Sequence, residues 1–232
     1  MSIPNLLNDD GSASMATALM MSHHGFRRDL AQFAASLERV TGGDAARVDA
    51  LCEEWTRFRA TLHGHHEAED HGVFPSLRAE HPAVAATIDR LFADHRRIDP
   101  LLERGDAAFA ALPGGGLAIA AASVVVDELR ALLDPHLATE EGELIPHLRG
   151  AKVFPAPASA AEAALYAEGF AWAMHGIAPD VLARVEVMLP AALLERIPAA
   201  RTAFAARCER VWGTAAAGAA RTPIPDPSQL LP

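Results

Sequence analysis

Cysteine, tyrosine and basic charge are scarce in this chain, and each shortage excludes a class of protein. Only two of the 232 residues are cysteines, and Cys52 and Cys208 lie too far apart to form a disulfide framework. A formal net charge of −10 argues against a nucleic-acid partner, because such a partner requires a basic surface. The chain lacks the run of about 18 apolar residues that a membrane span needs. No basic-then-apolar signal opens it, so we expect a cytoplasmic protein without a membrane or nucleic-acid partner.

What the chain has in abundance favours helices. Half of its residues are hydrophobic, whereas aromatic residues make up 6% and tyrosine occurs once. An alanine-rich composition of this kind suits helices better than sheets. The length allows one sizeable core and a small second lobe. We therefore expect an all-α fold.

Apolar residues recur in alternating steps of three and four along four segments, which is the pattern of helices with one buried face. The first segment covers residues 16–40 and ends at Gly42 and Gly43. The others cover residues 48–69, 84–102 and 117–140, and they are separated by Gly72 with Pro75 and by residues 113–116. Short connections predict an up-down-up-down four-helix bundle with a C-terminal helical extension. Pro135 should kink the fourth helix.

A metal-ligand pattern occurs twice, on the second and fourth of these helices. His65 is followed four residues later by Glu69, and His136 in the same way by Glu140, with a proline six residues after each glutamate. Residues four apart share one helix face, with Cβ atoms about 5–6 Å apart, so each copy offers a nitrogen and an oxygen ligand to one centre.

A single histidine precedes each copy by nearly the same interval, and both lie within the apolar stripes of the first and third helices. The chain therefore reads as two tandem helical hairpins. The candidate metal ligands are His23, His65, Glu69, His95, His136 and Glu140. His24 is the alternative to His23, although it falls outside the stripe. We expect His66 on a solvated face, and the alternative is a position behind the metal ligands.

Four imidazoles and two carboxylates suit iron, with manganese and zinc as alternatives. Six protein ligands exceed a four-coordinate zinc site but divide well over two metals bridged by both carboxylates. Such sharing leaves room for an oxo or hydroxo bridge and a small external ligand. Competing motifs fail, since the chain contains neither the His-Glu-x-x-His of metalloproteases nor the Glu-x-x-His of ferritin-like proteins. Burying these six groups without a metal would be costly.

Over residues 12–150 the chain resembles hemerythrin-like proteins of the HHE cation-binding type. The resemblance rests on His23 followed by the segment 26–30, on the two His-x-x-x-Glu pairs with their prolines, and on His95 before Ile98. It implies a non-haem di-iron centre that binds dioxygen, nitric oxide or peroxide. The oxygen carriers of the family place a second histidine one turn after the third-helix histidine. Here that position is Asp99, an extra-ligand candidate, so reversible oxygen carriage is in doubt.

The resemblance leaves several functions open. The first is sensing or storage of O2, NO or peroxide, with a role in oxidative or nitrosative stress. The alternatives are a di-iron peroxide-handling oxidoreductase of the catalase or peroxidase kind, and iron storage or donation. Residues 158–213 keep apolar content, which predicts a helical extension that packs on the bundle as a cover over the metals or forms a subunit interface in a homodimer. Residues 214–232 are expected to be a loose tail.

Overall fold

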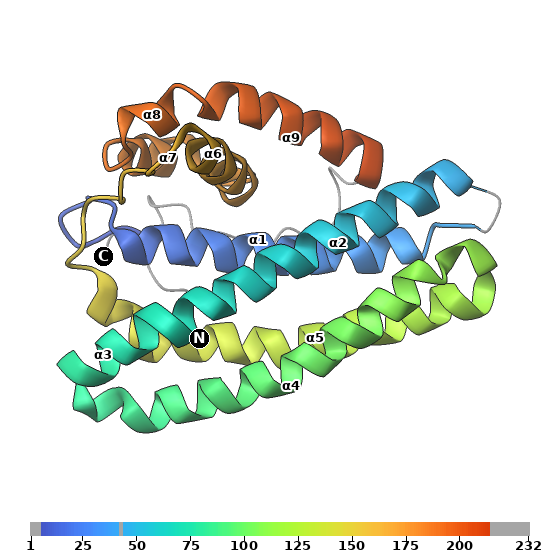
Figure 1. The fold of residues 1–232 in the computed structure, drawn as a ribbon, viewed down its shortest axis with the longest axis horizontal. Coiled ribbons are helices and arrows are strands. Elements are labelled where there is room, and N and C mark those ends of the chain that lie inside the picture. The colour runs from blue at the N-terminus through green and yellow to red at the C-terminus, as the bar shows by residue number, and fades with distance from the viewer. Residues whose placement is uncertain (1–5, 42–43, 214–232) are drawn as a thin grey trace. The chain divides into compact units, whose positions relative to one another are not determined.

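The regular structure of this chain is entirely helical wherever it is described. The computed structural model describes residues 6–41 and 44–213 (Figure 1). These residues divide into two compact units. The larger unit consists of Phe26–Leu144 with residues 210–213, and the second unit of residues 6–25 with Ile145–Glu209. The expected all-α fold class is confirmed. None of the described helices is long and apolar enough to cross a membrane.

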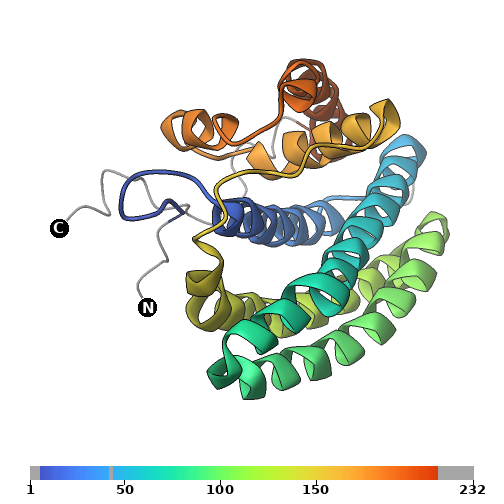
Figure 2. The same cartoon turned by 60° about the vertical axis from the view of Figure 1, so that its left-hand side comes forward.

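The larger unit begins within helix α1 (Met15–Leu37) and contains three further long helices. In chain order it holds α2 (Ala45–Ala68), a π-helical turn (Glu69–Val73), α3 (Phe74–Glu80), a 3-10 turn (Pro82–Val84), α4 (Ala85–Ala110), a second 3-10 turn (Leu112–Gly114), α5 (Gly116–Thr139) and a second π-helical turn (Glu140–Leu144). Helices α4 and α5 form a hairpin with α2 beside α4 (Figure 2). This arrangement brings the ends of α2 and α5 and the middle of α4 together.

The starts of these helices follow the sequence signals. The Asp44 carboxylate caps α2 by accepting a hydrogen bond of 3.2 Å from the backbone N–H of Arg47. Pro82 opens the turn that leads into α4, where its missing N–H costs nothing. Gly115 joins α4 to α5 with a φ of +83°, a conformation that favours glycine.

An aromatic cluster fixes the part of the larger unit that is remote from the histidines. Trp55 of α2 stacks on Phe109 of α4 with ring centroids 4.4 Å apart, and Phe33 of α1 meets both rings edge-on. Gly105 makes this stack feasible, because a Cβ at that position would lie 1.9 Å from the Trp55 ring. His65 follows Trp55 by ten residues, roughly 15 Å along the helix. The aromatic cluster therefore anchors α2 well away from its histidines.

Two sequence expectations about this unit are wrong in detail. Gly72 and Pro75 do not end the second helix, which continues through a π-helical turn into α3. Leu117 and Val124, expected in the buried stripe of the fourth helix, are 92% and 51% exposed. Leu117 lies in the first turn of α5, ahead of the first buried residue, Ala122, whereas Val124 lies beyond Ala122 on the exposed side of the helix. Helix α5 does continue through Pro135, and the expected end at Gly42 and Gly43 lies outside the described residues.

The second unit holds most of the C-terminal extension together with the start of α1. Its helices are α6 (Ala160–Met174), α7 (Pro179–Glu186), α8 (Ala191–Leu194) and most of α9 (Ile197–Trp212), preceded by a 3-10 turn (Ile145–Leu148). Gly25 of α1 packs directly on α6, since a Cβ there would lie 2.5 Å from the Trp172 ring. The Met15 N–H donates to the carbonyl of Ala151 at 2.8 Å. The extension therefore has a core of its own, although Leu165 is 65% exposed.

Candidate metal centre

A π-helical turn begins at the glutamate of each His-x-x-x-Glu pair. The first starts at Glu69 and the second at Glu140, so the two repeats match in backbone conformation as well as in sequence. In the first turn the Phe74 N–H reaches back five residues to the carbonyl of Glu69. Such turns are rare and frequent at functional sites. Both glutamates are 1% exposed.

One side of Glu69 faces three imidazoles. His66, Glu69, His95 and His136 each place a ligand atom within 4.8 Å of the others, and all four are buried. The Nε2 atoms of His95 and His136 lie 3.2 Å apart. Two nitrogen lone pairs that meet at this distance repel each other unless a proton or a cation lies between them. This group can therefore hold a cation through three nitrogens and one oxygen.

Asp70 orients the ring of His95. Its Oδ1 lies 2.7 Å from the His95 Nδ1, so this carboxylate accepts the Nδ1 proton and leaves the Nε2 lone pair pointing at the cluster. A carboxylate behind a histidine ligand is a common arrangement in metal proteins. The His136 Nδ1 lies 3.7 Å from an oxygen of Asp94, which is too far for a direct hydrogen bond.

The other side of Glu69 faces the second half of the repeat. His65, Glu69 and Glu140 also place ligand atoms within 4.8 Å of one another. The His65 Nε2 lies 3.1 Å from Oε1 of Glu69, and the His136 Nε2 lies 3.2 Å from Oε1 of Glu140. Glu69 is thus common to both groups, with one oxygen close to His65 and the other 3.7 Å from the His95 Nε2.

Sequence reasoning missed His66. We expected it on a solvated face, yet it is 3% exposed and its ring stacks on that of His95 at a centroid distance of 4.0 Å. Neither of its ring nitrogens has a hydrogen-bond partner. A buried imidazole without partners is costly, and a metal ion would supply a partner for one of these nitrogens. Its position three residues before Glu69, on the same helix face, is the signal that could have revealed it.

Burial and the neighbouring charges favour the uncharged forms of several side chains in the cluster. Burial, and then the neighbouring Glu140 and Asp70, raise the pKa of Glu69 well above its usual value. Burial lowers the pKa of His66, and the nearby His95 adds to this shift. Burial and His136 likewise lower the pKa of His95, against the opposing effect of Asp70. Both shifts favour the neutral imidazole for His66 and His95, which is the state that binds metals.

The remaining candidate ligands, His23, His24 and Asp99, differ in their surroundings. His23 is fully buried in α1, one turn before Phe26, whose ring lies 5.0 Å from the ring of His65. His24, the alternative, faces the turn after α6, because a Cβ on Gly176 would lie 3.3 Å from its Nε2. Asp99, the extra-ligand candidate, is exposed and belongs to neither group.

Arg27 holds the second π-helical turn against α1. Its Nη1 lies 2.5 Å from Oε1 of Glu141, and a second hydrogen bond of 3.2 Å makes the pair bidentate. Asp134 lies 3.6 Å from the same guanidinium. Glu141 is thereby turned away from the cluster, which leaves Glu140 as its carboxylate from this repeat.

Buried imidazoles and carboxylates, placed by π-helical turns among packed helices, define a helical metal-binding protein. The sequence model of the Hemerythrin HHE cation binding domain matches residues 14–148. The chain belongs to this family, and the resemblance noted in the sequence is confirmed. Comparisons with curated proteins and with solved structures found no match.

Metal binding should release a proton from Glu69. Because its pKa is raised, this carboxyl keeps a proton at pH values where an ordinary glutamic acid has lost it, and a metal ligand must be ionised. The affinity for metal should therefore rise with pH above the usual value of 4.5. Calorimetry at pH 6 in buffers of different ionisation enthalpy should detect a net release of protons on metal binding. Heats that are independent of the buffer would contradict this expectation.

Proposed function

We propose that this protein is a non-haem di-iron protein that binds a small oxygen or nitrogen species, O2, NO or peroxide, in order to sense or store it. The observation that carries the proposal is the buried position of Glu69 between two groups of ligand atoms. One carboxylate with a group on each side suits two ions better than one. The mixture of imidazole and carboxylate ligands suits iron.

In this proposal each iron ion has its own set of residues. His66, His95 and His136 hold one ion, His65 and Glu140 hold the other, and Glu69 is shared. We assign His23 to the second set as well. Its place on α1, three residues before Phe26, puts it on the helix face that contacts His65. The four helices α1, α2, α4 and α5 would then form the up-down-up-down bundle expected from the sequence, with the segment 158–213 as its cover.

The protein residues supply binding, orientation and a dry environment. Iron, when bound, supplies the site to which a small ligand attaches. Asp70 fixes the ring of His95, and the bidentate pair of Arg27 and Glu141 fixes the second π-helical turn. Leu62, Leu133 and Leu137, all fully buried, belong to the same stretches of α2 and α5 as the ligands. Side chains of this kind admit small apolar gases more readily than water or large polar molecules.

The position of His66 favours one of the two candidate functions, a binding protein, over the other, an oxidoreductase. The oxygen carriers have a second histidine on the third helix, which this chain lacks. On the sequence alone, that lack suggested open coordination positions and therefore peroxide chemistry. With His66, the set contains five imidazoles, the additional one supplied by α2 in place of α4. A fuller ligand set leaves fewer exchangeable positions, which favours binding over turnover.

The proposal is tested by the metal content and optical spectrum of the protein expressed with iron. We expect about two iron ions per chain, and a spectrum that changes reversibly with O2 or NO. Rapid loss of added peroxide, with the protein unchanged, would support the catalase- or peroxidase-like alternative instead. A single tetrahedral zinc without Glu69 among its ligands would overturn the di-iron proposal.

A further inference from the structure

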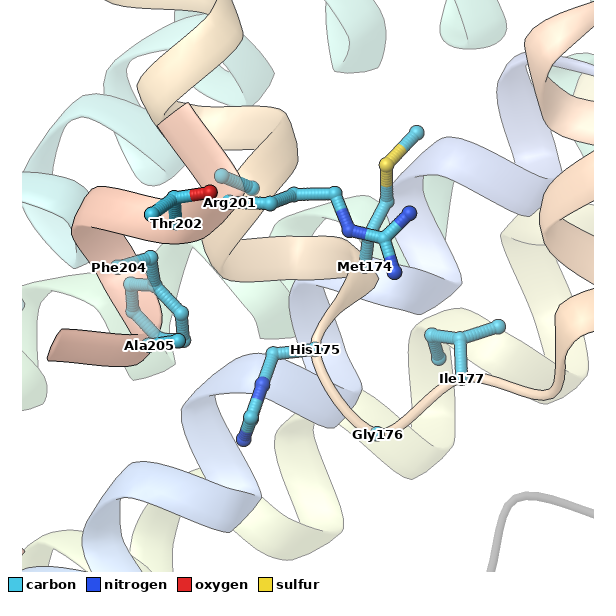
Figure 3. Close-up of a pocket in the computed structure, with 9 residues that line it drawn as sticks. Met174, His175, Gly176, Ile177, Arg201, Thr202, Phe204 and Ala205 are labelled. Carbon is cyan, nitrogen blue, oxygen red and sulfur yellow. The ribbon is translucent and has the colours of Figure 1, made fainter. Parts of the chain in front are cut away.

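A second candidate binding site lies in the C-terminal extension, entirely within the second unit. A pocket of about 330 Å³ opens between the end of α6, the turn that follows it and one face of α9 (Figure 3). Its volume is at the small end of the range of about 300–1,000 Å³ that is typical of ligand pockets. The larger unit and the metal-ligand groups contribute nothing to its lining.

Part of the lining of this pocket is apolar. Met174 and Ile177 are buried side chains on one side, and Phe204 of α9 is a buried aromatic ring on the other. The ring of His175 meets that of Phe204 nearly edge-on, with centroids 5.2 Å apart. Such a surface suits a ligand with an apolar body that is small enough to touch both walls.

The polar end of the pocket is cationic. The side chain of Arg201 extends from α9 across to Met174, so its guanidinium lies at the pocket (Figure 3). None of the described residues lining the pocket is acidic, although the chain as a whole carries a net charge of −10. No described carboxylate forms an ion pair with Arg201. An arginine without an acidic partner among the described residues is available to an anion.

The turn that forms one wall has a fixed shape. Gly176 has a φ of +86°, and a side chain there would be strained and would also press on His24 of α1. The ring of Phe204 on α9 is held by a cation–π contact, because the guanidinium of Arg207 lies 4.8 Å from the ring centre. The pocket is thus preformed, which lowers the entropic cost of binding.

We propose that this pocket binds a small organic monocarboxylate with an apolar body of about the size of benzoate. The planar guanidinium of Arg201 accommodates the two carboxylate oxygens side by side, and this geometry favours a carboxylate over a neutral group of the same shape. The apolar body would lie against the exposed edges of Phe204, Met174 and Ile177. This site is independent of the metal centre and of the function proposed for it.

Calorimetric titration of the metal-loaded full chain with benzoate tests this proposal. We expect one site per chain with a Kd below about 1 mM, and at least tenfold weaker binding of the neutral isostere benzamide. Arg201→Gln should weaken benzoate binding by about tenfold or more, without lowering the melting temperature, because Arg201 is exposed. Ala205→Leu, which extends an exposed lining residue into the pocket, should also abolish binding.

Arg196→Gln is the matched control, since this exposed arginine precedes α9 but does not line the pocket, and its benzoate affinity should equal that of the wild type. Benzoate that fails to bind, or that binds Arg201→Gln as well as the wild type, overturns the proposal. The second outcome would be expected if benzoate bound to the metal centre. Inorganic phosphate that binds as tightly as benzoate overturns the role of the apolar walls.

Discussion

Replacing His66 with alanine should reduce the iron content from about two ions per chain to about one. The three-imidazole group would keep only His95 and His136 as nitrogen ligands, and loss of a direct ligand should cost more than the 10–100-fold in affinity that is typical of a group behind a ligand. The ion held by His65 and Glu140 should remain, because His66 belongs to the other group. Iron content and the optical spectrum measure both effects.

His66→Phe separates a metal ligand from a packing residue. His66 stacks on His95 at 4.0 Å, and a phenyl ring can preserve that stack while removing both nitrogens. We expect the phenylalanine variant to lose one ion like the alanine variant, with a smaller loss of stability. The control is His63→Ala, which removes an exposed imidazole one turn earlier on α2 and should change nothing. Two ions retained in His66→Phe would show that His66 only packs.

The failure to predict His66 from the sequence has a physical cause. The heptad-like stripe of α2 runs through Leu62, His65 and Glu69, so an ideal helix turns His66 towards the side of the stripe. His66 nevertheless lies three residues before Glu69 in α2, close enough around the helix to face the same centre, and the apolar stripe alone does not indicate this. Gly72 and Pro75 were correctly recognised as an irregularity, but a change of helix type cannot be told from a helix end by periodicity alone.

Other parts of the fold and of the site could be predicted from the sequence. Asp44 and Pro82 open helices because one offers a cap and the other needs no donor, and both effects are local. The burial of His95, Glu69 and Glu140 follows from their places in apolar stripes. By contrast, the exposure of Leu117 depends on how far α5 extends beyond its neighbours. No local sequence pattern predicts how far a helix extends beyond its neighbours.

The position of His24 beside the turn at Gly176 could not be predicted from the sequence either. Both His23 and His24 are buried, so burial alone does not separate them. The two histidines differ in their contacts with the C-terminal extension. The turn at Gly176 lies against His24, and Trp172 occupies the space beside Gly25. An alanine-rich segment such as α6 offers few signals of its packing partner. The helical character of residues 158–213 was therefore predictable, whereas its packing on the start of α1 was not.

Replacing Glu69 with glutamine should remove both metal ions, which is a larger effect than any other single change at the centre. Its two oxygens face different groups, and an amide offers one oxygen and no charge. We expect iron to fall well below one ion per chain. Glu67→Gln is the matched control, because Glu67 is exposed and pairs with His71 on the outer face of the helix. Retention of two ions would contradict the shared position of Glu69.

The same variant should make the metal-free protein more stable. Burial and Glu140 raise the pKa of Glu69, so its ionisation opposes folding, and stability falls as the pH rises above the usual value of 4.5 towards the pKa in the folded protein. Glutamine removes this loss, and its advantage should therefore be absent near pH 4 and grow towards pH 8. About 1 kcal/mol corresponds to about 2–4 °C in a protein of this size. Thermal unfolding of both chelator-treated proteins across this range measures the difference. Equal melting temperatures at pH 8 would mean that the empty site tolerates a charged Glu69, and metal binding would then need no proton release.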